Sequence, residues 1–311
     1  MDKSINIQRI VNTAGNLDKV SEGLTVSIVS SNEDGDPVKI RAYATEEEAL
    51  EKENLLDQLR EKIDIPEFFG RWRNYLVFRY LDLDQGDSSV NIHESYFSIG
   101  RFLGSINKIK VDEIGAEALQ HEFSNWLDRL SRMRLIPSWV KGDAIAYYQQ
   151  NKPQNLPICI DYWDAMPHNF GWTDGDFYLL DEKHLRPSYQ GIGLIKPLYL
   201  LQEEEWQRVK EGYTSVSSTY QGIDDNLGFL KFYYLVAALY FYSLISAAGR
   251  ISLGKNLRFL DYRDRLISTV SSWSIVTKLR SDVNLYRTYP LDVPYLFWRR
   301  VSPTKSQTRV T

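Results

Sequence analysis

The stretch of sequence that decides the fold is Asp161-Tyr162-Trp163-Asp164-Ala165-Met166-Pro167-His168-Asn169. A second aspartate, Asp181, follows twelve residues after Asn169, at the end of the apolar run 176–181. Between them, Asp174-Gly175 separates two aromatic runs and is a strong signal for a tight hairpin turn, because both central residues of a type I′ turn need a positive φ. Such a hairpin would bring Asn169 and Asp181 together at adjacent strand ends.

The side chains at these positions suit a metal-assisted reaction. An amide oxygen and a carboxylate are suitable ligands for Mg²⁺, which takes a few protein oxygens together with substrate phosphates. We therefore predict Asn169 and Asp181 as metal ligands. Asp164 lies in a loop stiffened by Pro167, and we predict that it orients a hydroxyl and accepts its proton. The alternative is that all three are ordinary turn and strand-end residues, where Asp and Asn are common.

Composition narrows the class of protein. The chain has 311 residues and is 43% hydrophobic, which is enough for one large domain or two lobes. Its net charge of −4 argues against a nucleic-acid binder, which usually has a basic stripe. Cys159 is the only cysteine, so neither an internal disulfide nor a zinc cluster of thiols is possible. The polar segment Met1–Asn6 lacks the apolar core of a secretory signal, and we expect a cytoplasmic protein.

The N-terminal part predicts a small sheet with one helix. Apolar and alternating segments indicate strands at 5–11, 24–29, 38–43, 67–72 and 75–80. Between the third and fourth, Thr45 and Glu48 form a capping box that predicts a helix to about Glu61. Its expected apolar side consists of Leu50, Leu55, Leu56 and Leu59.

A polar, turn-rich segment at 81–87 marks the expected boundary between lobes. We expect an N-terminal lobe at 1–82, a helical C-terminal lobe at 83–301 and a flexible tail at 302–311. Within the second lobe, helices are expected at 116–133, 136–149, 203–213, 227–250 and 258–279. The fold class is therefore α+β.

The run Phe232–Ala248 contains seventeen residues without a charge. A spanning helix needs about 20 predominantly apolar residues, and this run is shorter and carries four tyrosines and two serines. We predict a buried helix of the helical lobe and no membrane attachment. A membrane-associated segment is the alternative.

The run Asp161–Asn169 and the aspartate that follows it, Asp181, carry a family resemblance. Their order and spacing resemble the kinase-like fold, specifically the aminoglycoside phosphotransferase and choline kinase branch of small-molecule kinases. That family's signature is a catalytic Asp, a Pro three residues on, an Asn five residues on and a metal-binding Asp after a hairpin, matched here by Asp164, Pro167, Asn169 and Asp181. The resemblance covers roughly residues 5–200. It implies a small N-terminal antiparallel sheet lobe and a larger, mainly helical C-terminal lobe.

The resemblance also implies a function: a kinase that uses ATP and Mg²⁺ to phosphorylate a hydroxyl of a small molecule. The family lysine that holds the ATP phosphates falls on Arg41, with Lys39 as the alternative two residues earlier. Its helix glutamate partner falls on Glu53. The hinge that contacts adenine falls on 78–81, with Phe78 and Tyr80 as cofactor-binding residues. The segment 181–193 would shape the choice of acceptor, and we assign no role to His184 within it.

Departures from the family pattern keep other functions open. Arg41 replaces the phosphate lysine, the glycine-rich loop at 14–16 matches poorly, and Glu182-Lys183 follows Asp181 where Phe-Gly would be expected. A pseudokinase that binds a nucleotide or a partner without transfer is one alternative. A second is an enzyme that transfers AMP to a protein hydroxyl. The identity of the acceptor and the oligomeric state do not follow from the sequence.

Overall fold

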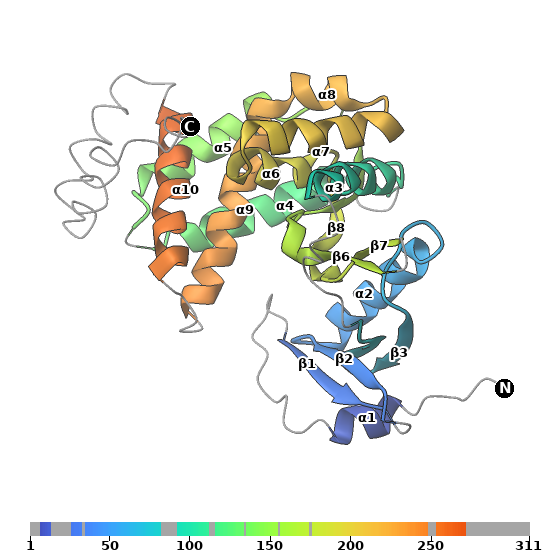
Figure 1. Cartoon of the computed structure of the whole chain (residues 1–311). Coiled ribbons are helices and arrows are strands. Elements are labelled where there is room, and N and C mark those ends of the chain that lie inside the picture. Colours follow the sequence, from blue (N-terminus) through green and yellow to red (C-terminus); the bar gives the residue numbers. More distant parts are fainter. Residues whose placement is uncertain are drawn as a thin grey trace. The chain divides into compact units, whose positions relative to one another are not determined.

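The chain, seen in a computed structural model, divides into two compact units (Figure 1). The first combines Met1–Leu119 with Gln154–Leu230, and the second combines Gln120–Pro153 with Lys231–Thr311. The structure describes residues 7–13, 26–32, 35–81, 92–111, 116–133, 135–154, 156–173, 176–247 and 253–271. The expected lobe boundary at residues 82–83, the expected tail at 302–311 and the expected glycine-rich loop at 14–16 lie outside the described residues.

A four-stranded antiparallel sheet belongs to the first unit. Its strands are β1 (Val26–Ser31), β2 (Pro37–Ala42), β3 (Phe68–Trp72) and β4 (Tyr75–Arg79), in the spatial order β1-β2-β4-β3. Strand β2 is central and pairs with β1 on one side and β4 on the other. Because alternate residues of a strand share a face, Lys39 and Arg41 project from the same side of β2.

The segment predicted as a first strand at 5–11 is wrong for its described part, which is helix α1 (Ile7–Thr13). Its apolar residues Ile7, Ile10 and Val11 have the spacing of a helix face, and Ile10 and Val11 are buried in the core of the sheet. A short apolar run does not distinguish strand from helix by periodicity alone. The described part of this sheet therefore has four strands rather than five.

Helix α2 (Glu46–Leu59) begins at the predicted capping box. The backbone N–H of Glu48 donates to Oγ1 of Thr45 at 3.1 Å, and the Glu48 carboxylate accepts the backbone N–H just before the cap, also at 3.1 Å. The buried residues include the predicted Leu55, Leu56 and Leu59. Leu50 is 44% exposed, contrary to the prediction, because Ala49 takes the buried position one residue earlier.

The rest of the first unit combines helices with short strands. Its helices are α3 (Ile92–Ile106), α6 (Ile195–Leu200), α7 (Glu203–Val216) and α8 (Tyr220–Asp225). Two antiparallel strand pairs join β5 (Ile158–Tyr162) to β8 (Leu185–Tyr189) and β6 (Phe170–Thr173) to β7 (Asp176–Leu179). Three short 3₁₀ helices are η1 (Pro167–Asn169), η2 (Glu182–His184) and η3 (Ile192–Leu194).

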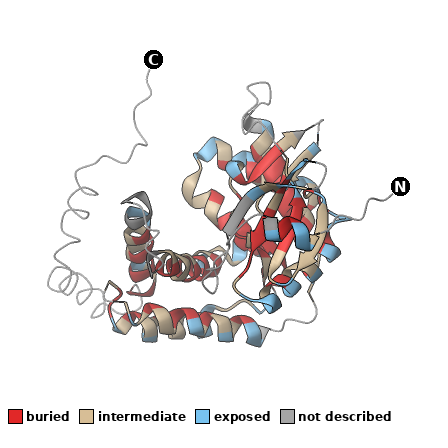
Figure 2. Cartoon of the chain, turned by 90° about the horizontal axis from the view of Figure 1, so that it is seen from below, coloured by how far each residue is buried: buried red, intermediate tan, exposed pale blue. Residues whose placement is uncertain are grey.

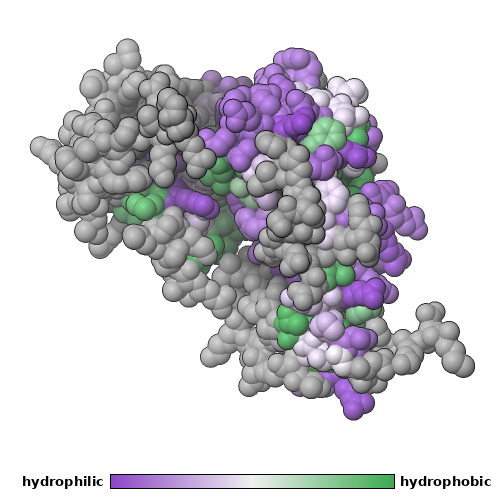
Figure 3. All heavy atoms as spheres, in the orientation of Figure 1, coloured by the Kyte–Doolittle hydropathy of each residue, from purple (hydrophilic) through white to green (hydrophobic). Residues whose placement is uncertain are grey.

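Glycines allow α3 and α7 to pack with their backbones in close approach. A Cβ atom added at Gly212 of α7 would lie 1.9 Å from the carbonyl oxygen of Phe97, and one added at Gly100 of α3 would lie 1.9 Å from that of Val209. Hydrophilic residues gather over α7 and α8 in Figure 3, so the outer surface of these helices is polar. The pair forms a rigid support for β5, with which α3 is also in contact.

The second unit is helical in its described part. It contains helices α5 (Trp139–Asn151) and α10 (Leu253–Ser271) and, except for their first four residues, helices α4 (Ala116–Leu130) and α9 (Leu227–Ala247). Aromatic rings fill its core: Phe123 stacks on Tyr148 with centroids 4.4 Å apart and on Tyr233 with centroids 5.5 Å apart. These contacts join three of its helices.

Helix α9 contains the uncharged run Phe232–Ala248 up to residue 247, and the last residue of the run lies outside the described residues. Among the helices that the structure describes, α9 alone is long and apolar enough to span a membrane. Of its window Leu227–Ile245, 56% is buried inside the structure, and Figure 2 shows buried residues along the helices. A buried helix without membrane attachment stays a prediction, with a membrane-associated segment as its alternative.

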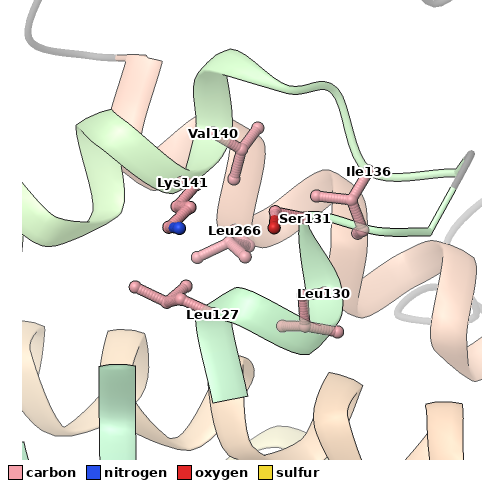
Figure 4. Close-up of a pocket in the computed structure, with 7 residues that line it drawn as sticks. All are labelled: Leu127, Leu130, Ser131, Ile136, Val140, Lys141 and Leu266. Carbon is pink, nitrogen blue, oxygen red and sulfur yellow. The ribbon is translucent and has the colours of Figure 1, made fainter. Parts of the chain in front are cut away.

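A small apolar hollow lies among the helices of the second unit (Figure 4). Its lining consists of Leu127, Leu130, Ser131, Ile136, Val140, Lys141 and Leu266. The ammonium of Lys141 pairs with Asp128 at 2.5 Å. Because a ligand site needs a few convergent polar groups in addition to apolar walls, we regard the hollow as a packing feature.

Candidate active site

The loop after β5 is closed by hydrogen bonds of its own residues. Asn169 lies at the end of η1 and is buried, and its side-chain Nδ2 donates to the carbonyl oxygen of Asp164 at 2.7 Å. Two backbone bonds tighten the same turn, from Met166 N–H to the Asp164 carbonyl at 2.8 Å and from Asn169 N–H to the Met166 carbonyl at 2.9 Å. The loop therefore holds Asp164 and Asn169 in one compact turn.

The β6–β7 hairpin returns the chain to this loop. Thr173 pairs with Asp176 across it, while the predicted turn residues 174–175 lie outside the described residues. The backbone N–H of Leu180 donates to the carbonyl oxygen of Asn169 at 2.8 Å. Asp181, the next residue, is thereby brought next to Asn169, as the spacing predicted.

Asp181 lies between two cations. Its Oδ1 is 2.9 Å from Nη2 of Arg41, and its Oδ2 is 2.8 Å from Nζ of Lys183. Burial raises the pKa of the Asp181 carboxyl, but Arg41 and Lys183 outweigh burial and hold that pKa well below its usual range. Asp181 is thus ionised at neutral pH.

The two candidate cations of strand β2 both contact the segment that follows the hairpin. Arg41 is only 2% exposed, and its Nε lies 2.5 Å from Oε1 of Glu182. Lys39 donates its Nζ to the carbonyl oxygen of Leu180 and lies 3.4 Å from Oε2 of Glu182. Burial lowers the pKa of Lys39, although Glu182 opposes that effect. The sequence left open which of the two cations faces the site, and the structure brings both there.

The expected ion pair between Arg41 and Glu53 is not the one that forms. Glu53 pairs instead with Arg71 of β3, with 2.6 Å between Oε2 and Nε. The neighbouring α2 residue Lys52 points toward the site, and its Nζ donates to the carbonyl oxygens of Lys183, at 3.3 Å, and of Leu185. Helix α2 therefore contributes a cation where a carboxylate was expected, because one position along a helix rotates a side chain by about 100°.

The predicted hinge residues lie at the end of β4 and just beyond it. Phe78 is 1% exposed and packs against Phe68 with ring centroids 5.3 Å apart. Tyr80 is half-buried, and its backbone N–H donates to the carbonyl oxygen of Pro37 at 3.3 Å. Phe78 thus packs in the hydrophobic core beside the sheet, and the role of residues 78–81 as an adenine hinge stays a prediction.

Two further residues flank the Asp164 side chain, and neither was among the predicted site residues. Lys196 of α6 forms an ion pair with Oδ1 of Asp164, and Nε2 of His184 lies 3.5 Å from Oδ2. Burial raises the pKa of Asp164, but Lys196 and His184 lower it to below its usual range. Burial also lowers the pKa of His184 to about 4, which leaves its ring neutral at pH 7. The only sequence signal for Lys196 was its place just after the Gly191–Gly193 turn.

The Gly191–Gly193 turn is held on strand β5 by a buried carboxylate. Asp161 of β5 accepts the backbone N–H groups of Gly191 at 2.9 Å and of Gly193 at 3.2 Å. Burial raises the pKa of Asp161 to about 6. Gly191 has a φ of 86°, and a Cβ atom at Gly193 would lie 2.4 Å from Oδ1 of Asp161. These contacts fix the start of α6, and with it Lys196.

Asn169 and Asp181 have the donor atoms that Mg²⁺ requires. Asn169 uses its NH₂ group toward Asp164, which directs the amide oxygen elsewhere. The two Asp181 oxygens, which Arg41 and Lys183 contact, are carboxylate oxygens of the kind that Mg²⁺ prefers. The described residues contain no cluster of three His, Cys, Asp or Glu side chains suited to a metal. Mg²⁺ is usually held by one or two protein groups together with substrate phosphates, and its binding by Asn169 and Asp181 stays a prediction.

Comparison with known proteins places this geometry in a known fold. No protein-family model and no curated protein matches the chain. The choline kinase LicA from Streptococcus pneumoniae matches it with a TM-score of 0.61 at 12% identity, over 85% of this chain and 97% of that one. Plasmodium vivax ethanolamine kinase matches with a TM-score of 0.56 at 15% identity, over 83% and 81%.

The amicoumacin kinase hAmiN, solved with AMP-PNP and Ca²⁺, matches with a TM-score of 0.51 at 11% identity, over 79% of this chain and 86% of that one. Identities this low establish the fold alone. The mixed α+β architecture, with its small antiparallel sheet and larger helical part, is the two-lobed kinase-like fold of small-molecule kinases.

Proposed function

We propose that the protein is a phosphotransferase that uses ATP and Mg²⁺ to phosphorylate a hydroxyl group of a small molecule. The observation that carries this proposal is the approach of Asp164, Asn169 and Asp181 at one loop and hairpin, with the β2 cations reaching Asp181. Phosphoryl transfer needs little covalent chemistry from the protein, and depends on positioning and charge neutralisation. In this proposal the loop and hairpin residues position the reactants, and the β2 cations neutralise phosphate charge.

Each residue has a defined role in this proposal. Asp164 orients the acceptor hydroxyl and takes its proton as the oxygen attacks the γ-phosphorus, and the low pKa of Asp164 keeps its carboxylate ionised. Asn169 and Asp181 hold Mg²⁺, which neutralises charge on the phosphates when bound. Lys39 and Arg41 contact the phosphates.

The adenine lies at the hinge of Phe78 and Tyr80. The acceptor binds near Asp164 and the segment 181–193, whose side chains include His184.

Two solved structures with a similar fold support the use of a nucleotide. LicA was solved with AMP, and it matches this chain with a TM-score of 0.58. The amicoumacin kinase hAmiN was solved with AMP-PNP and Ca²⁺. By analogy of fold, the proposal extends a nucleotide and a divalent cation to this chain. It also places the protein in the cytoplasm, where its buried Cys159 stays reduced.

Asp164→Asn tests the assignment, because it removes the base and preserves the shape of the side chain. We expect the variant to bind ATP with Mg²⁺ as the wild type does and to lose phosphate transfer by about a hundredfold or more. Transfer is measured as ADP release against a panel of hydroxylated small molecules. The exposed Asp225→Asn in α8 serves as the control and retains the wild-type rate. Normal transfer by Asp164→Asn would rule out the assigned role.

A pseudokinase is the second candidate, and one observation favours it. Arg41 and Lys183 both occupy Asp181, so the metal ligand is neutralised by the protein itself. Thermal stabilisation by ATP in the absence of transfer to any acceptor would support this candidate. Attachment of AMP to the protein, visible by mass spectrometry after incubation with ATP, would identify the third alternative, AMP transfer.

A further inference from the structure

Glu182 is a buried carboxylate that both β2 cations share. It is 1% exposed, and its Oε1 lies 2.5 Å from Nε of Arg41. Its Oε2 lies 3.4 Å from Nη2 of Arg41 and 3.4 Å from Nζ of Lys39. A buried carboxylate of this kind is tolerated only when opposite charges surround it, and these two cations provide them.

Arg41 also depends on Glu182 as a partner for its buried charge. Arg41 is 2% exposed, and its only other carboxylate partner in the described structure is Asp181. Asp181 is the proposed metal ligand, so a metal ion bound at its Oδ1 would compete with Arg41 for that oxygen. Glu182 offers Arg41 a second carboxylate that no metal needs. It can therefore keep the guanidinium in place while Asp181 turns to the metal.

Helix α2 does not supply this function. Its carboxylate at position 53 is engaged with Arg71, and its Lys52 holds the carbonyl oxygens on either side of His184. Lys52 thereby fixes the backbone of the same short segment that carries Glu182. Helix α2 and strand β2 both contact the segment after Asp181 through their cations. Glu182, the carboxylate that pairs with Lys39 and Arg41, lies on that segment.

We propose that Glu182 is the positioning residue that holds Lys39 and Arg41 for the nucleotide phosphates and leaves Asp181 free for the metal. This inference rests on the proposed function. It differs from the expectation drawn from the sequence, which gave this role to Glu53. It couples phosphate binding to metal binding through two adjacent residues of one chain segment.

The test compares ATP binding by the wild type, Glu182→Gln and the matched control Glu53→Gln, each with Mg²⁺ and with a chelator. Loss of the charged anchor is expected to weaken Mg²⁺–ATP binding by about tenfold or more in Glu182→Gln. The control breaks a partly exposed ion pair and is expected to change it by less than about twofold. The increase in ATP affinity caused by Mg²⁺ is also expected to shrink in Glu182→Gln, because Arg41 then has only Asp181.

A second variant keeps the test valid if Glu182→Gln does not fold. Glu182→Asp retains the buried charge but shortens the side chain, and it is expected to weaken binding by about fivefold because it cannot reach both cations. Circular dichroism confirms the fold of each variant. The inference alone is overturned if the wild type binds Mg²⁺–ATP and both Glu182 variants bind it equally well. A wild type that binds no nucleotide overturns the proposed function and this inference together.

Discussion

Replacing Gly193 by alanine is expected to disturb both the fold and the candidate site. Gly193 lies in η3, three residues before Lys196, and its φ is not among the positive ones, so the backbone itself does not demand glycine. Glycine is needed at this position because any side chain would clash with neighbouring atoms. An added Cβ atom would lie 2.4 Å from Oδ1 of Asp161 and 2.5 Å from the carbonyl oxygen of Tyr162. Neither oxygen can yield easily, because one belongs to a buried, hydrogen-bonded carboxylate and the other to the backbone of β5.

The size of the effect follows from these distances. A carbon atom normally stays about 3.3 Å from such an oxygen, so η3 must move by roughly 0.8 Å. Overpacking of this kind costs about 1–3 kcal/mol, and weakening the bond from Gly193 N–H to the buried Asp161 carboxylate costs about 1.5–3 kcal/mol more. Alanine restricts the unfolded chain and returns about 0.4–1 kcal/mol. We expect a net loss of about 3 kcal/mol.

Urea unfolding at pH 7 measures this loss. Gly222→Ala in α8 is the matched control, because a Cβ atom there meets nothing within 4 Å and alanine favours a helix by up to about 1 kcal/mol. If Gly193→Ala also moves Lys196 away from Asp164, phosphate transfer falls with stability, since a shift of about 1 Å can cost about a hundredfold in rate. A Gly193→Ala protein as stable as the wild type would refute the packing of this turn on β5.

Three further changes test other parts of the structure. Gly212→Ala, whose Cβ atom would lie 1.9 Å from the Phe97 carbonyl oxygen, is expected to lower the free energy of unfolding by about 2–3 kcal/mol in urea titrations. Lys196→Met removes a charge that lowers the pKa of Asp164, so the acid limb of the pH–rate profile should move up by about one pH unit. His184 has its pKa lowered by burial to about 4, so the unfolded state binds more protons between that value and the ordinary 6.5, and stability is lost as the pH falls through this window. His184→Gln should therefore lose up to about 2 kcal/mol less than the wild type between pH 7 and pH 5.

The part of the site that the sequence predicted depends on short-range structure. Asp164 and Asn169 lie in one turn, and Asp181 returns to them through a single hairpin, so spacing along the chain was sufficient to predict that they lie close together. The same holds for the start of α2, where Thr45 caps the helix through neighbouring atoms. Local rules failed at 5–11, where the described residues form a helix because the sheet offers a surface for the face of Ile10 and Val11.

The parts of the candidate site that were not predicted depend on contacts between residues far apart in the sequence. Glu182 lies 141 residues from Arg41, and Lys196 lies 32 residues from Asp164, so neither pair follows from spacing along one element. The family resemblance assigned Glu53 as the partner of Arg41, because Glu53 lies on the helix that carries the family's glutamate. Whether Glu53 or Lys52 faces the site depends on the rotation of α2, which the burial of Leu55, Leu56 and Leu59 sets.

The charges around Asp181 bear on whether the protein is an active kinase or a pseudokinase. Arg41 and Lys183 pair with the two oxygens of Asp181, and a carboxylate neutralised in this way attracts Mg²⁺ alone only weakly. ATP brings its own negative charge to the same cations, and phosphate oxygens can take Arg41 and Lys183 away from the carboxylate. On this reasoning the metal binds well only together with the nucleotide. Weak Mg²⁺ binding to the free protein is therefore expected of an active enzyme with this arrangement, and only phosphate transfer itself separates the two candidates.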